Sequence, residues 1–132
     1  MPEQETVQKA RRAKRQGKAP TTQAGAFVEE EIKHVRQGKH GARSTKQAIA
    51  IGLSKARRAG VKLRPPEKGE TSERTRTSAK RAYAAGQRGR KKPSAKRARA
   101  VRGALKREGH AAASHKALSR QARTAARKRK AK

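Results

Sequence analysis

Residues 27–63 read FVEEEIKHVRQGKHGARSTKQAIAIGLSKARRAGVKL and hold nine of the fifteen large apolar side chains in a chain of 132 residues. Within them, Val28, Ile32 and Val35 follow the i, i+4, i+7 spacing of one helix face. The three glutamates at 29–31 suit the start of such a helix, because carboxylates near a helix N-terminus interact favourably with its dipole. The spacing predicts a first helix here.

A polar loop with two glycines, Gly38 and Gly41, follows this helix, and Gly38 is placed to end it. Ser44 and Gln47 then have the form of a capping box, in which each side chain satisfies a backbone N–H at a helix start. The segment TKQAIAIGLSKARRA at 45–59 predicts a second helix, so the two elements form a short helical hairpin. We place the hairpin core at Val28, Ile32, Val35, Ile49 and Leu53.

Outside residues 27–63 the chain has few large apolar side chains that a core could bury. Leu, Ile, Val and Phe make up 13 of the 132 residues, which is below the roughly 20% under which a highly charged chain is expected to be largely disordered alone. We therefore predict an all-α protein, a helical hairpin with flanking basic Ala-rich helices, substantially disordered when free. Nine large apolar residues are marginal for a monomeric core, so the hairpin is also a candidate for self-association.

The expected domain organisation follows the composition. It comprises a basic N-terminal helix or arm at 1–21, the hairpin at 22–64, a Pro/Gly linker at 65–71, and a polycationic Ala/Lys/Arg-rich tail at 72–132. Within the tail, nascent helices are expected near 72–85, 94–108 and 112–130.

The net charge of the chain indicates which class of molecule it binds. The chain carries 39 Lys and Arg against nine acidic residues, a formal net charge of +30, and a polyanion both relieves this repulsion and releases counterions on binding. Stacking on single strands uses aromatic platforms, and the sequence has only Phe27 and Tyr83. Phosphate contact with duplex DNA, without base reading, is therefore favoured over sequence-specific recognition.

The candidate nucleic-acid-binding residues are the cations of the densest basic runs: Arg57, Arg58, Arg88, Arg90, Lys91, Lys92, Lys96, Arg97, Arg99, Arg102, Lys106, Arg107, Arg120, Arg123, Arg127, Lys128, Arg129 and Lys130.

Catalysis has little support in the sequence. There is no Cys, no Asp and no Gly-rich phosphate loop, so we expect no enzyme and no cofactor. The four histidines, His34, His40, His110 and His115, show no metal-binding spacing with supporting carboxylates, so we expect no metal site.

The segments ARSTKQAIAIGLSKARRAGVKL at 42–63 and EEEIKHVRQGKHG at 29–41 resemble a family of small, basic, uncharacterised bacterial proteins, some of which are labelled DNA-binding or plasmid stabilisation proteins. The resemblance implies a bacterial origin and a DNA-associated role, and it brings no catalytic residues. The C-terminal half is similar to linker-histone-like tails in composition only.

These observations predict a nucleoid-associated, histone-like architectural protein of the cytoplasm that neutralises phosphates and compacts DNA. Two alternatives stay open: a basic RNA- or ribosome-associated protein, and a plasmid-maintenance module in which the hairpin docks a specific protein. We expect no membrane association, because no segment approaches the roughly 18 consecutive apolar residues of a membrane span.

Overall fold

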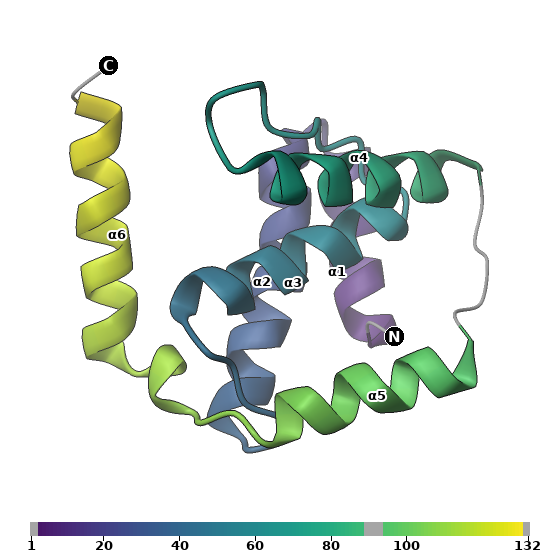
Figure 1. Cartoon of the computed structure of the whole chain (residues 1–132). Coiled ribbons are helices and arrows are strands. Elements are labelled where there is room, and N and C mark those ends of the chain that lie inside the picture. Colours follow the sequence, from purple (N-terminus) through teal and green to yellow (C-terminus); the bar gives the residue numbers. More distant parts are fainter. Residues whose placement is uncertain (1–2, 89–93, 131–132) are drawn as a thin grey trace. The chain divides into compact units, whose positions relative to one another are not determined.

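The computed structural model describes residues 3–88 and 94–130, which form an all-α fold (Figure 1). Within these ranges there is no strand, only an isolated bridge between Lys68 and Thr71. The helices are α1 (Gln4–Arg15), α2 (Pro20–Arg36), α3 (Thr45–Arg58), α4 (Glu73–Arg88), α5 (Ala95–Lys106) and α6 (His115–Lys130), with a short 3-10 helix at Ala111–Ala113. The all-α prediction is confirmed. None of the helices in the described ranges is long and apolar enough to span a bilayer.

Glycines end the first three helices. Gly17, Gly38 and Gly60 follow α1, α2 and α3 with φ values of 73°, 76° and 100°, a region that side chains with a Cβ rarely adopt. After α3, the Gly60 N–H donates to the Arg57 carbonyl and the Val61 N–H donates to the Ala56 carbonyl, both at 3.1 Å. This pattern is a Schellman motif, and the helix stop predicted at Gly38 is confirmed.

The predicted capping box at the start of α3 is present in a shifted form. The N–H of Gln47 donates to Ser44 Oγ at 3.1 Å, as expected. Gln47 Oε1 accepts from the N–H of Arg43 at 2.6 Å, one residue before the N-cap. The two side chains therefore still satisfy two backbone donors at the entry to the helix.

The helix-start role expected for the glutamates at 29–31 is wrong. α2 begins at Pro20, the first helical position that proline favours, so these glutamates lie in the middle of the helix. Glu30 is 5% exposed and Glu31 is 0% exposed. Sequence reasoning placed the helix start at its first large apolar residues and passed over TTQAGA, which contains none.

The described residues form two compact units that interleave along the chain. Unit 1 takes its residues from 1–30 and 51–92, and unit 2 takes its residues from 31–50 and 93–132. The expected organisation instead followed chain order, so both the hairpin at 22–64 and the tail at 72–132 are shared between the units. Independent folding of the hairpin stays a prediction.

Unit 1 has a small core around Phe27, which is 1% exposed. Ala24 of α2, Ala56 of α3 and Ala10 of α1 pack with it, and Val61 closes the cluster after α3. Partly buried apolar side chains cover this core: Val7, Leu53 and Leu63. The segment after α3 therefore folds back onto this core.

Unit 2 builds its core from alanines around Val35, which is 0% exposed. Ala42 and Ala48 join it from the α2–α3 loop and from α3, and Ala112 and Ala113 join it from the 3-10 helix. Sequence reasoning treated these last two alanines as the start of a tail helix. Their burial was missed because alanine runs give no amphipathic signal of their own.

The five predicted hairpin-core residues are divided between the two cores. Val35 is buried in unit 2 with Ile32 packed partly against it, and Leu53 packs against the core of unit 1. Val28 and Ile49 are half-buried and belong to neither cluster of buried residues.

Candidate nucleic-acid interface

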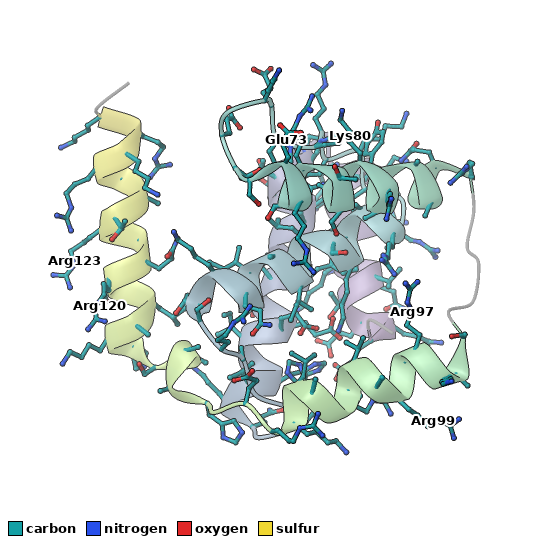
Figure 2. The ribbon with its side chains drawn as sticks, in the orientation of Figure 1. Glu73, Lys80, Arg97, Arg99, Arg120 and Arg123 are labelled. Carbon is teal, nitrogen blue, oxygen red and sulfur yellow. The ribbon has the colours of Figure 1, made fainter. Side chains whose placement is uncertain are left out.

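α6 carries a straight row of cations. Ser114 caps the helix, its Oγ accepting from the N–H of Ala117 at 3.1 Å. From there, cations recur at alternating spacings of four and three residues, which places them on one face of an α-helix. We call the row the α6 stripe: Lys116, Arg120, Arg123, Arg127 and Lys130, all exposed. Figure 2 shows Arg120 and Arg123 extending to the same side of the helix.

The other side of α6 is mostly uncharged before Lys128 and Arg129, and it is little covered. Leu118, Gln121 and Ala125 lie roughly opposite the stripe and are half-buried. No residue of α6 is buried. The helix therefore offers its cations to solvent with little packing along its length.

α5 is also exposed, but its cations are more widely distributed. Ser94 caps it by accepting from the N–H of Arg97 at 3.2 Å, and no residue of the helix is buried. Arg97 and Arg99 leave the helix on opposite sides (Figure 2). The exposed cations expected here are Lys96, Arg97, Arg99, Arg102, Lys106 and Arg107. This helix can contact phosphates from several directions.

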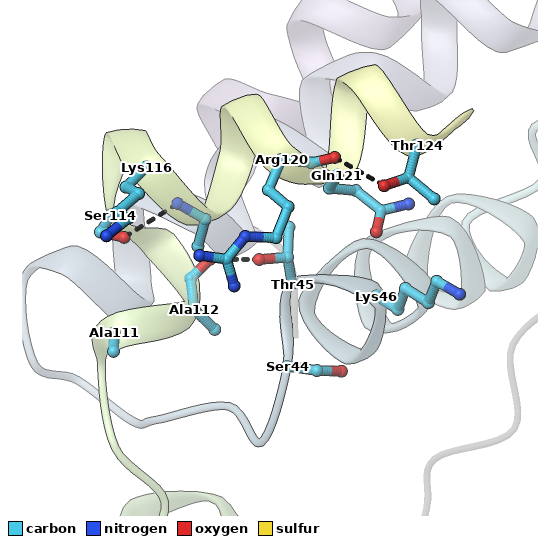
Figure 3. A pocket seen from close by; sticks show the side chains of 11 residues that line it. Ser44, Thr45, Lys46, Ala111, Ala112, Ser114, Lys116, Arg120, Gln121 and Thr124 are labelled. Atoms are coloured by element: carbon cyan, nitrogen blue, oxygen red, sulfur yellow. Dashed lines mark hydrogen bonds between the residues drawn. The ribbon is translucent and has the colours of Figure 1, made fainter. Parts of the chain in front are cut away.

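An open groove of about 640 Å³ lies beside the α6 stripe within unit 2 (Figure 3). The start of α3, the 3-10 helix and the first turns of α6 form its walls. Three cations line it, Lys46, Lys116 and Arg120, and its lining contains no carboxylate. Such a lining suits a phosphate group, because three cations lie within one concave surface.

The two units differ in charge pattern. Unit 2 contains nineteen basic and two acidic residues, a formal net charge of +17, and every Lys and Arg that the structure describes in it is exposed. Of its two carboxylates, Glu31 is buried and Glu108 is half-buried. Unit 1 carries seven glutamates, six of them exposed, including Glu73 at the start of α4 (Figure 2). The uninterrupted cationic surface therefore belongs to unit 2.

Arg57 is buried, unlike the other described candidate cations, so it does not belong to the surface that could contact nucleic acid. It is 7% exposed, and its Nε and Nη2 donate to the carbonyls of Leu63 and Arg64, each at 3.2 Å. Burial lowers the pKa of Arg57 from its ordinary value through desolvation. Its guanidinium fixes the position of the segment after α3, because it donates hydrogen bonds to two successive backbone carbonyls of that segment.

The other candidate cations fall into three groups. Arg58 and Arg88 are exposed on unit 1, and Lys128 and Arg129 are exposed on α6 away from the stripe. Arg90, Lys91 and Lys92 lie outside the described residues. Sequence reasoning missed Lys46 and Lys116, although the four-residue step from Lys116 to Arg120 was a signal that could have found the second of these.

Comparison with known proteins gives a family but no activity. The model of a family of unknown function matches residues 3–68, half of the chain. This range contains α1, α2 and α3 and ends before α4. The chain matches none of the curated proteins and none of the solved structures with which it was compared.

Proposed function

Because the chain belongs to DUF6496, a family of unknown function, we propose from its own residues that it binds duplex DNA through phosphate contacts of unit 2, without reading sequence. In this proposal the protein is a nucleoid-associated architectural protein that neutralises and compacts DNA. The α6 stripe is the observation that carries it.

The stripe suits a duplex in length and charge. From Lys116 to Lys130 it extends about 21 Å at 1.5 Å per residue, roughly the rise of six base pairs at 3.4 Å each. Five cations over this length match a row of phosphates along one strand or across a groove. No exposed carboxylate interrupts the surface in the part of unit 2 that the structure describes.

The aromatic residues argue for a duplex over a single strand. The sequence has one Phe, one Tyr and no Trp. Phe27 is 1% exposed in the core of unit 1, so it offers no platform for a base, and Tyr83 is half-buried on α4. Proteins that bind single strands typically stack successive bases on exposed aromatic rings. With base stacking disfavoured, contact with the phosphates of a duplex is the mode of binding that we propose.

The lack of burial on α5 and α6 supports coupled folding. A helix without buried residues gains little from packing, and like charges along it repel. Phosphates that neutralise the cations remove this repulsion. We propose that α6 and α5 before its last turn are substantially disordered in the free protein and become ordered on DNA.

A charge-matched pair of variants tests the proposal in the full-length chain. The first replaces four stripe cations by Gln: Lys116, Arg120, Arg123 and Arg127. The control replaces four exposed cations of α1 in the same way: Arg11, Arg12, Lys14 and Arg15. Both variants have the same net charge, so a difference between them reports position.

Affinity for a short duplex is measured by fluorescence anisotropy over a salt series. We expect the slope of log K against log salt to fall by about 0.9 for each phosphate that the variant no longer neutralises, or roughly 3 to 4 for the stripe variant. The slope of the control should fall by less than half as much. Equal reductions would mean that net charge alone drives binding, and absence of binding by the natural chain at low salt would refute the proposal. A clear preference for structured RNA at matched salt would favour the RNA alternative.

A further inference from the structure

A buried carboxylate in unit 2 faces two imidazole rings. Glu31 of α2 is 0% exposed, His34 lies one turn later on the same helix, and His40 lies in the loop after α2. His40 Nε2 is 3.1 Å from Glu31 Oε2, and His34 Nδ1 is 3.9 Å from Glu31 Oε1. The two ring centroids are 6.0 Å apart and the rings are nearly perpendicular, at 83°. The rings therefore approach the carboxylate from different directions.

His40 is oriented with its Nε2 toward the Glu31 carboxylate. Its Nδ1 lies 2.9 Å from the carbonyl oxygen of Gly41, and because a carbonyl can only accept, Nδ1–H is the donor. In the neutral ring this leaves a lone pair on Nε2, aimed at a carboxylate oxygen of Glu31. Two acceptors 3.1 Å apart repel unless a proton lies between them or a metal ion beside them binds both.

The donor set favours a metal ion. The three ligand atoms of Glu31, His34 and His40 lie within 4.8 Å of one another. Two ligands of a tetrahedral zinc ion, with bonds of about 2.0 to 2.1 Å, are roughly 3.4 Å apart. His40 Nε2 and Glu31 Oε2 are already near this spacing, and the ligand atoms that lie farther apart, within 4.8 Å, have to approach one another. The His40 bond to the Gly41 carbonyl is the outer-shell contact that metal-bound imidazoles usually make.

The loop that carries His40 is held in place. The N–H of Gly41 donates to the Leu105 carbonyl at 2.7 Å, and the N–H of Ala42 donates to the Gly109 carbonyl at 2.9 Å. A β-carbon at Gly41 would overlap the carbonyl oxygen of Glu108, so the two backbones touch. Access remains, because the side chains of His34 and His40 are 12% and 13% exposed.

We propose that Glu31, His34 and His40 bind one Zn²⁺ ion, with a fourth position left for water. Two imidazoles and one carboxylate, without thiolate, form a set that zinc accepts. The ion links α2 to the loop before α3 and so stabilises unit 2. This inference is independent of the proposed function, since it uses none of the cations of the α6 stripe.

The experiment uses untagged full-length protein freed of metal by a chelator. Co²⁺ is titrated while its visible absorption is recorded, and Zn²⁺ is then added to displace it. We expect one equivalent to bind with a tetrahedral spectrum. Glu31→Gln and His40→Ala should each weaken binding by about 10-fold or more, whereas His110→Ala and His115→Ala, at exposed positions, should leave it unchanged.

A measurement on the natural chain covers the case in which a variant fails to fold. In histidine ring NMR, Zn²⁺ should shift the signals of His34 and His40 and leave those of His110 and His115 in place. Equal responses from all four rings, or no saturable binding, would overturn the proposal in favour of a proton between His40 and Glu31. Salt separates this site from DNA binding, because screening of the +17 charge should not weaken binding of a cation whereas it weakens binding of DNA.

Discussion

Gly52 of α3 lies directly against the backbone of Val28 in α2. A β-carbon at Gly52 would come within 2.6 Å of Val28 Cα and 3.1 Å of the Phe27 carbonyl oxygen. Within unit 1 the two helices therefore touch through their backbones, and this contact places Phe27 in the core beside Ala56. Only glycine allows such an approach, because it has no Cβ.

Gly52→Ala should destabilise the protein although alanine favours helices. The helix propensity gain of up to about 1 kcal/mol is outweighed by displacement of α2, for which overpacking costs of about 1 to 3 kcal/mol are typical. Urea unfolding measures the difference. The control is Gly25→Ala in α2, where nothing lies within 4 Å of an added β-carbon, so stability should rise or stay unchanged. Equal effects of the two substitutions would contradict the close contact.

Arg57→Ala should lower stability and leave DNA affinity nearly unchanged for the folded protein. It removes the hydrogen bonds to the carbonyls of Leu63 and Arg64, and bonds that involve a charged donor are worth about 1.5 to 3 kcal/mol. Its exposed neighbour supplies the control, since Arg58→Ala should change stability by less than about 0.5 kcal/mol. Thermal unfolding and anisotropy measure the two effects. A large drop in affinity in a stable Arg57→Ala protein would return this residue to the interface.

Thr45→Val should weaken the docking of the 3-10 helix on α3. Thr45 is 8% exposed and its Oγ1 donates to the Ala112 carbonyl at 2.6 Å. Valine keeps the shape but leaves that buried carbonyl unsatisfied, at a cost of about 1 to 3 kcal/mol. Hydrogen exchange of the amides near Ala113 would report it. In the control, Thr124→Val, the bond removed is an exposed one to the Arg120 carbonyl, so protection should not change.

Ser114→Ala should reduce the helicity of α6 in the free protein. The substitution removes the cap on the Ala117 N–H, which is worth about 1 kcal/mol, and α6 has no buried residue to compensate. Far-UV circular dichroism measures the decrease, and added duplex should restore most of the helicity if phosphates stabilise the helix. Ser119→Ala, in the exposed middle of the same helix, should instead raise helicity slightly. No change for Ser114→Ala would show that α6 does not depend on its cap.

The candidate site was only partly predictable from the sequence. The cations of α5 and α6 were found by counting charge, and their exposure agrees with that prediction. The burial of Arg57 was missed because a basic run carries no sign of which member turns inward. The contact between His40 and Glu31 was missed because it depends on a loop reversing direction between them. Such a reversal has no periodic signature.

The amino-acid sequence by itself determined most of the helical segments, their glycine stops and a net charge of +30, from which we predict a polyanionic partner. These properties are local or additive, so they follow from neighbouring residues and from composition. Only the tertiary structure decided that residues 31–50 join residues 93–132 in one unit, and that Glu31 and Arg57 are buried while the α6 stripe is exposed. Burial depends on contacts between segments far apart in the chain, and alanine- and glycine-mediated contacts of this kind leave almost no trace in hydrophobic spacing.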